Sequence, residues 1–320
     1  MKLLKLVVAA VVLLSWQILS GLEGKGLLAG LVAHAQGPCP LRGSCNLEPG
    51  LQGRSDLLMF EDFERSTWQS AWTGFDFPEN LSAVSSPVFA GSRGLEMRVP
   101  TGQHDGGSFW LTFRNLGISE PEELYFRYYV RFNDTWQRNG DGELAKFPGF
   151  DSAYGTNAGH GCTRSDGTNG WSARMMTYDR GSQHQVGFYT YHVDMPEECG
   201  EHMFWTPMME RNRWYRLEAH VKVNTISGGR GNNDGILEGW IDDQLAFRRT
   251  NLRFRDVSNL RIESIWGNIY VGGNWVADRN MAIHFDNMVV ARNRIGAGSA
   301  PSSEVPPAPQ NLRILSSGAE

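Results

Sequence analysis

Four side chains near the middle of the chain are of types that bind anions or move protons. Lys146 lies two residues before a Pro-Gly pair, and Arg174 lies in the next apolar segment. Tyr189 and Tyr191 are separated by one residue, so on a strand they would point to the same face. A lysine or an arginine can neutralise a carboxylate, and a phenol can give or accept a proton. Each also has an ordinary explanation, because strand lysines are usually solvated and tyrosine pairs usually pack.

The elements that must position these side chains are strands. Apolar and polar residues alternate over 124–132 and over 214–223, which predicts half-buried strands. Residues 236–247 predict a hairpin with an acidic turn, and two further strands are expected at 262–271 and 281–291. Many short strands without alternating helices predict an all-β fold, a jelly-roll sandwich of two curved antiparallel sheets. The concave face of such a sheet can hold an extended polymer.

Both ends of the chain differ from this middle part. Lys2 and Lys5 precede an apolar run, and Ala33 and Ala35 are small residues at the positions that a signal peptidase reads. A signal peptide over residues 1–35 is therefore expected. It would make the protein secreted and extracellular, with no stable membrane association after cleavage. The alternative is an N-terminal membrane anchor, although the run is too short to span a bilayer alone.

The remaining chain divides by composition. We expect an N-terminal extension at 36–57, a single domain at 58–294 and a disordered Pro- and Ser-rich tail at 295–320. The net charge is −5 with both signs mixed along the chain, which argues against a nucleic-acid partner. We also expect a monomer.

Four cysteines lie outside the predicted signal peptide. Export makes disulfides plausible, and four cysteines allow three connectivities. Sequence proximity favours Cys39–Cys45 and Cys162–Cys199. A metal site is the weaker alternative because the chain has no C-x-x-C pair.

Several catalytic motifs are missing from the sequence. It has no G-x-S-x-G, no H-E-x-x-H and no phosphate-binding glycine loop. Retaining glycosidases on related jelly rolls use an E-x-D-x-x-E strand, and the segment that begins at Glu61 lacks that spacing. A glycoside hydrolase is therefore only the third hypothesis.

Residues 60–291 resemble the polysaccharide lyase family 14, which includes alginate and glucuronan lyases. The segment 146–150 (KFPGF) is similar to the family's K-L-P-G-L, with phenylalanines in place of its leucines. Residues 155–169 are unusual for the family. Further similar segments are Trp171-Ser172-Ala173-Arg174, Tyr189-Thr190-Tyr191-His192, Arg213-Trp214-Tyr215-Arg216-Leu217-Glu218, Leu252-Arg253-Phe254-Arg255-Asp256 and Phe285-Asp286-Asn287.

The resemblance implies a concanavalin A-like jelly roll that cleaves an acidic, uronate-containing polysaccharide by β-elimination, with no required cofactor. It implies catalytic roles for Lys146, Tyr189 and Tyr191. Lys146 would neutralise the carboxylate or take the proton, and a tyrosine would act as base or acid. The expected substrate-binding residues are Arg174, His104, His192, Trp266 and Asn268. The rival hypothesis is a non-catalytic carbohydrate-binding protein that uses aromatic platforms.

Two carboxylates require a separate hypothesis. In similar jelly rolls an acid near the first strand and the aspartate of the last strand hold a structural calcium ion, here Glu61 and Asp286. The alternative is that both only cap turns through hydrogen bonds.

Overall fold

The computed structural model describes residues 39–156 and 158–297, and almost all of its regular structure is β. The predicted signal peptide and most of the predicted tail lie outside these residues. Three short 3₁₀ segments, η1 (Trp68–Ala71), η2 (Pro78–Asn80) and η3 (Phe113–Leu116), are the helical elements of the described part. None of the described helices is long and apolar enough to cross a membrane.

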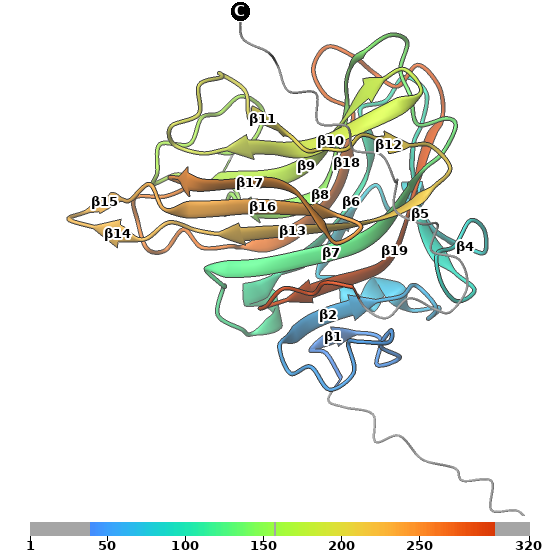
Figure 1. The fold of residues 1–320 in the computed structure, drawn as a ribbon, viewed down its shortest axis with the longest axis horizontal. Coiled ribbons are helices and arrows are strands. Elements are labelled where there is room, and N and C mark those ends of the chain that lie inside the picture. Colours follow the sequence, from blue (N-terminus) through green and yellow to red (C-terminus); the bar gives the residue numbers. More distant parts are fainter. Residues whose placement is uncertain (1–38, 157, 298–320) are drawn as a thin grey trace, which may run out of the picture. The chain divides into compact units, whose positions relative to one another are not determined.

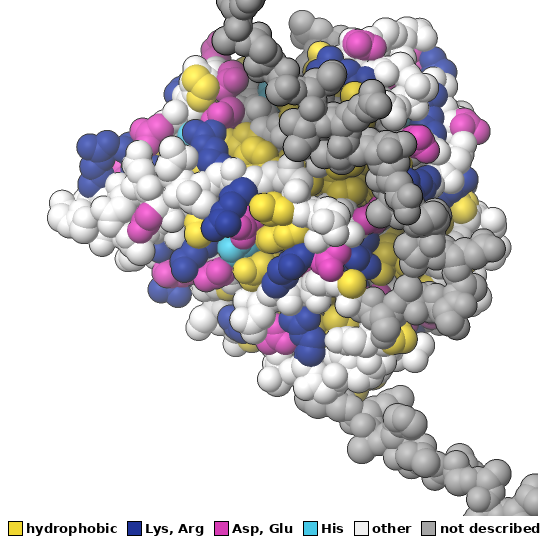
Figure 2. All heavy atoms as spheres, in the orientation of Figure 1, with side chains coloured by type: hydrophobic (Ala, Val, Ile, Leu, Met, Phe, Trp, Pro, Cys, Tyr) yellow, Lys and Arg dark blue, Asp and Glu magenta, His cyan; other side chains and the backbone are white. Residues whose placement is uncertain are grey.

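The first layer is a nine-stranded sheet (Figure 1). Its order is β1 (Arg42–Gly43), β2 (Leu57–Glu61), β19 (Met281–Ala291), β7 (Glu123–Phe132), β13 (Trp214–Lys222), β16 (Gly235–Ile241) and β17 (Gln244–Leu252), with β5 (Gly94–Val99) beside β19 and β4 (Leu81–Val84) beside β5. All its pairs are antiparallel except the parallel β1–β2 pair. Figure 2 shows acidic and basic side chains interspersed over this layer, as the mixed charge of the sequence predicts.

The second layer is an eight-stranded antiparallel sheet that carries the catalytic residues expected from the sequence. Its order is β11 (Glu201–Phe204), β10 (Gln183–Tyr191), β9 (Trp171–Arg180), β8 (Gly142–Ser152), β18 (Ser264–Tyr270), β6 (Asp105–Thr112) and β3 (Gly74–Asp76), with β12 (Met209–Glu210) beside β10. A separate small hairpin joins β14 (Ile226–Ser227) and β15 (Arg230–Gly231).

The core lies between the inner faces of the two sheets. On β7 the alternate residues Phe126, Tyr128, Val130 and Phe132 are fully buried, as their spacing predicts. The eight-stranded sheet contributes Phe147, Phe150, Met175 and Phe188 to the same apolar cluster. The outer face of this sheet is therefore left for polar chemistry.

The sequence predictions for strands and cysteines are largely confirmed. β16 and β17 form the expected hairpin, and its turn residues Asp242 and Asp243 have positive φ angles of 49° and 74°, typical of a tight two-residue turn. Both predicted disulfides, Cys39–Cys45 and Cys162–Cys199, are present.

The segments that flank the predicted domain pack onto it. β1 pairs with β2, and Leu51 and Leu57 are buried beside Phe60. At the other end the backbone N–H groups of Ile295 and Gly296 donate to the carboxylate of Glu218, at 2.7 and 2.9 Å. These two residues, which composition assigns to the tail, are therefore held by the sheet.

Candidate active site

Strand register brings the predicted catalytic residues together on the outer face of the eight-stranded sheet. Arg174 on β9 lies directly opposite Tyr189 on β10. Lys146 on β8 lies opposite Met176 on one side and Tyr270 of β18 on the other. Since successive strand residues point to opposite faces, the alternate residues face the core while this row faces outward.

The Pro-Gly pair after Lys146 interrupts the strand pairing. The register between β8 and β9 shifts between Phe147 and Phe150, where Pro148 has no N–H to donate. A Cβ atom on Gly149 would lie 2.6 Å from the carbonyl oxygen of Ala173, so only glycine fits this close approach. The irregularity in this segment thus sets the register of the site.

The ammonium group of Lys146 is almost fully enclosed by protein. Its side chain is 6% exposed and forms an ion pair with Glu143. The ammonium nitrogen lies 4.4 Å from the ring centre of Tyr189 and 5.9 Å from that of Tyr270. Burial lowers the pKa of Lys146, and the neighbouring Glu143 carboxylate partly offsets this effect. The lysine is therefore poised to lose its proton more readily than a solvated lysine.

Glu143 and His202 complete the surroundings of this lysine, and the sequence analysis assigned neither of them a role. The Nε2 atom of His202 lies 3.0 Å from the second carboxylate oxygen of Glu143. Burial alone would raise the pKa of Glu143, but the His202 hydrogen bond and the Lys146 ammonium hold it at about 2. His202, which is on β11, also lies directly opposite Tyr189 of β10. Glu143 is therefore ionised at neutral pH and provides a negative charge beside Lys146.

The two tyrosines meet edge to face. Their ring centres are 5.6 Å apart, and the hydroxyl of Tyr191 accepts the backbone N–H of Cys162 at 3.0 Å. Burial raises the pKa of Tyr189, and the neighbouring Tyr191 and Glu143 raise it further. Tyr189 is therefore a protonated phenol at neutral pH, which suits an acid better than a base.

Arg174 contacts two of the other expected substrate-binding residues, Asn268 and Trp266, through its guanidinium group. It donates to Asn268 at 2.9 Å and lies 4.4 Å above the ring of Trp266. Asn268 in turn donates to Ser108 at 2.9 Å. The buried Nε atom of Arg174 has no hydrogen-bond partner among residues 39–156 and 158–297. Burial lowers the pKa of Arg174, yet an arginine stays charged, so the site retains a donor without a partner.

The two expected histidines are placed differently. His104 stacks on Tyr270 at 5.6 Å, and its Nδ1 atom lies 2.8 Å from the carbonyl oxygen of Val271, so it borders the site. His192 follows Tyr191 and points to the opposite face, where it contacts Glu201 at 2.6 Å. The same Glu201 pairs with Arg249 of the other sheet. The structure therefore does not bring His192 together with the tyrosine pair.

The two carboxylates of the calcium hypothesis lie on neighbouring strands. Glu61 accepts the backbone N–H of Phe63 and the guanidinium of Arg65, at 2.8 and 2.6 Å. Asp286 accepts three backbone N–H groups, those of Phe89, Ala90 and Asn287.

No group of three or more acidic, histidine or cysteine side chains suited to a metal occurs in the described parts of the chain. Because calcium takes six to eight oxygen ligands, these carboxylates alone fall short of a calcium set. Calcium stays a prediction, which thermal melts with added calcium and with a chelator would test.

Comparison with known proteins places the sequence of this chain in a family. The sequence pattern of the family described as polysaccharide lyase 14 matches residues 95–288, more than half of the chain. No curated protein matches the chain in sequence.

Solved structures share the fold at low identity. Alginate lyase vAL-1 from Chlorella virus is 17% identical, with 74% of this chain and 100% of that chain covered and a TM-score of 0.56. The marine PL-14 alginate lyase from Aplysia kurodai is 15% identical, with 75% and 100% covered and a TM-score of 0.56. A substituted form of alginate lyase Aly36B in complex with alginate tetrasaccharide is 16% identical, with 80% and 99% covered and a TM-score of 0.57. These similarities establish the shared jelly-roll architecture.

Proposed function

The chain belongs to the polysaccharide lyase 14 family, and on this premise we propose that it is a secreted enzyme that cuts uronate-containing polysaccharide, of the alginate or glucuronan type, by β-elimination. The observation that carries the proposal is the row of Lys146, Arg174 and Tyr189 across three neighbouring strands. In our proposal these three side chains act as the proton acceptor, the cation and the proton donor, respectively.

Elimination first requires a more acidic proton on C5 of the uronate. That proton becomes acidic only when the adjacent carboxylate is neutralised, because negative charge then develops on the carboxylate oxygens. We assign this role to Arg174, whose guanidinium is held in place by Asn268 and Trp266. Planar arginine donors match a carboxylate well.

Lys146 and Tyr189 then divide the proton transfers. Lys146 in its neutral form takes the C5 proton, and the released electron pair forms the C4–C5 double bond. The C4–O bond breaks, and its electrons go to the glycosidic oxygen, which receives the proton of the Tyr189 hydroxyl. The lowered pKa of Lys146 and the raised pKa of Tyr189 support this division. Tyr191, fixed by the Cys162 N–H, positions Tyr189.

The test is the product of elimination. Incubation with alginate and with glucuronan should increase the ultraviolet absorbance near ~235 nm, because only elimination creates the conjugated unsaturated uronate. Hydrolysis would release reducing ends without this absorbance. If neither of these polymers, nor a polymer in which uronate alternates with a neutral sugar, gives an absorbance increase, the lyase proposal is wrong.

The rival function is glycan binding without cleavage. The stacked indoles of Trp110 and Trp266 favour it, because flat aromatic faces on an outward strand face can hold sugar rings. Saturable binding of the polymers without new absorbance or new ends would support this alternative.

The proposal includes export from the cell. Two disulfides fit an oxidising compartment, and we propose cleavage of the signal peptide after Ala35. Mass spectrometry of the protein from the culture medium would give the mature N-terminus, and a sizing measurement would test the proposed monomer.

A further inference from the structure

A recess on the outer face of the eight-stranded sheet is bordered by Trp266, the indole that packs against Arg174. It is a cavity of about 370 Å³, within the range of pockets that hold small ligands. Two indoles, Trp110 and Trp266, form one part of its lining, and the carboxyl groups of Asp151 and Glu263 form another. His160, from the loop after β8, also lines it. The proposed elimination chemistry uses only the edge of this recess.

The aromatic part of the lining is flat. Trp110 on β6 and Trp266 on β18 are a directly opposed cross-strand pair, with ring centres 6.1 Å apart and planes inclined by 14°. The indole nitrogen of Trp266 is buried and has no hydrogen-bond partner among the described residues. Indole faces bind the C–H faces of sugar rings.

The acidic part of the lining is held firmly. Asp151 is 6% exposed, and one of its oxygens lies 2.8 Å from Nε2 of His160. Glu263 accepts the backbone N–H of Tyr154 at 2.5 Å. The second oxygen of each carboxyl group has no hydrogen-bond donor in the described part of the chain. Both are therefore ready to accept hydrogen bonds from hydroxyl groups.

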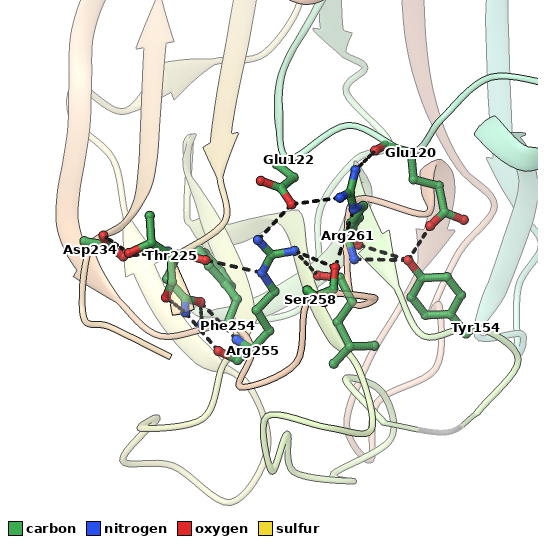
Figure 3. A network of polar contacts seen from close by, with 11 residues as sticks. Glu120, Glu122, Tyr154, Thr225, Asp234, Phe254, Arg255, Ser258 and Arg261 are labelled. Carbon is green, nitrogen blue, oxygen red and sulfur yellow. Dashed lines mark hydrogen bonds and ion pairs between the residues drawn. The ribbon is translucent and has the colours of Figure 1, made fainter. Parts of the chain in front are cut away.

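The backbone behind the acidic lining is fixed by a polar network (Figure 3). The hydroxyl of Tyr154 donates to Glu120 at 2.7 Å and accepts the backbone N–H of Arg261 at 3.1 Å. The backbone N–H of Glu263 donates to the carbonyl oxygen of Asp151 at 3.0 Å, which ties the two acids together. Hydrogen bonds therefore hold the backbone that carries both carboxylates in place.

The two acidic side chains of this pocket determine whether a charged or an uncharged sugar unit can bind there. One indole separates it from the cationic site, since Arg174 lies 4.4 Å from the ring of Trp266 and His160 lies 4.8 Å from the same ring. A uronate in the pocket would bring its carboxylate against Asp151 and Glu263, and like charges repel strongly when partly desolvated.

We propose that this pocket binds an uncharged sugar unit adjacent to the uronate that is cleaved. This changes the substrate expected in the proposed function: instead of a pure polyuronate of the alginate or glucuronan type, the preferred substrate is a polysaccharide in which uronate alternates with a neutral sugar. The inference rests on the proposed lyase function for the uronate position, and it adds the identity of the neighbouring unit.

The first experiment compares polymers. Hyaluronan and unsulfated chondroitin alternate glucuronate with an uncharged N-acetylhexosamine, whereas glucuronan is all uronate. We expect kcat/KM to be at least about tenfold higher on an alternating polymer. Glu263→Gln should narrow that ratio by raising kcat/KM on glucuronan, and Glu123→Gln, on the other sheet, should leave the ratio unchanged. An equal or higher kcat/KM on glucuronan, or a ratio that Glu263→Gln does not change, would overturn the inference while the lyase function stands.

The second experiment needs no turnover. Calorimetric titration with chitotetraose, a neutral oligosaccharide, should show binding that Trp110→Ala weakens by about tenfold. Thermal melts would confirm that this variant is folded. Binding of this kind by a protein that cuts no polymer would refute the proposed lyase function but keep the neutral-sugar pocket. Absence of chitotetraose binding would refute the pocket whether or not the protein is a lyase.

Discussion

Two polar networks of this protein contain a buried arginine, and they differ in how many nitrogens of its guanidinium group have a hydrogen-bond partner. Arg255, in the network of Figure 3, uses all of its guanidinium nitrogens. Nε donates to the carbonyl of Asn224 at 3.3 Å, Nη1 donates to the carbonyls of Ser258 and Leu260, and Nη2 pairs with Glu122 at 3.1 Å. A guanidinium with every nitrogen paired to its own chain is a structural brace.

Arg174 is equally buried but makes one hydrogen bond, to Asn268, and rests on an indole. Its Nε stays unpartnered within the described residues. Arg174 is therefore held by fewer hydrogen bonds than Arg255, and it lies beside the proposed catalytic residues. The comparison therefore separates scaffold from site: substitutions in the first network should change stability, and those in the second should change activity.

The largest expected effect is at Lys146. Lys146→Ala should lower kcat by about 10³-fold or more, because it removes the proposed proton acceptor. The variant loses the buried ion pair with Glu143, which keeps His202 as a partner, so a thermal melt should confirm that it is folded at the assay temperature. The assay is the initial rate of absorbance increase on a substrate that the native protein cleaves.

Lys222 provides the matched control. Its side chain is 46% exposed and pairs with Glu123 on the other sheet. Lys222→Ala should retain native kcat. Full activity in Lys146→Ala would remove Lys146 from the mechanism.

Arg255→Met should give the opposite result. It leaves the carbonyls of Asn224, Ser258 and Leu260 without their donor, so the free energy of unfolding should fall by about 3 kcal/mol. The kcat of the folded protein should stay native. Urea unfolding measures the first quantity. Arg248→Met, at a side chain 58% exposed, should change stability by less than about 0.5 kcal/mol. Equal stability of the two variants would contradict the assignment of Arg255 as a brace.

Glu143→Gln should shift the pH dependence of the reaction. The Glu143 carboxylate raises the pKa of Lys146, so its removal lowers that pKa further. If neutral Lys146 is the base, the rising limb of log(kcat/KM) against pH should move to lower pH by about one unit. Glu123→Gln, which alters the exposed Lys222 pair, should not move it. A limb that stays in place or moves to higher pH would show that Lys146 does not act as the base.

The smallest effect is expected at Asp286, which belongs to neither network. Burial raises its pKa to about 7 despite three backbone donors. In the unfolded chain it titrates near its ordinary 3.8, so the folded state retains a proton that the unfolded state loses between these values. Stability therefore falls as pH rises from about 4 to about 7 and then levels off.

Asp286→Asn cannot titrate, so its stability should be flatter over this window. Over this window the slopes of unfolding free energy against pH should differ between the two proteins by about 1 kcal/mol per pH unit. Urea unfolding at several pH values measures it, and parallel pH profiles would refute the raised pKa.

The sequence predicts most of the fold because alternation is a local property. The inward row of β7, the β16–β17 hairpin and the shared face of Tyr189 and Tyr191 all follow from the two-residue period of a strand. The same rule, applied to His192, would have placed it on the face opposite to Tyr191.

The residues that sequence analysis missed depend on longer-range geometry. Glu143 is three residues from Lys146 and would face the other way on a regular strand. A register shift between Glu143 and Ala145 lets its side chain reach the lysine. His202 joins the site because β11 pairs with β10, and His160 lines the neighbouring pocket because its loop returns to Asp151. The alternation of apolar and polar residues along a strand does not predict the order of the strands in a sheet or the path of a loop.

The distribution of lysines has a practical consequence for handling the protein. Residues 39–297 contain two lysines, the enclosed Lys146 and the exposed Lys222. Lys222 lies on the outer side of the nine-stranded sheet, whereas the candidate active site is on the outer side of the other sheet. Among the lysines of this region, amine-reactive beads or dyes should therefore attach at Lys222. Attachment there would leave the candidate active site facing away from the bead and open to a polymer.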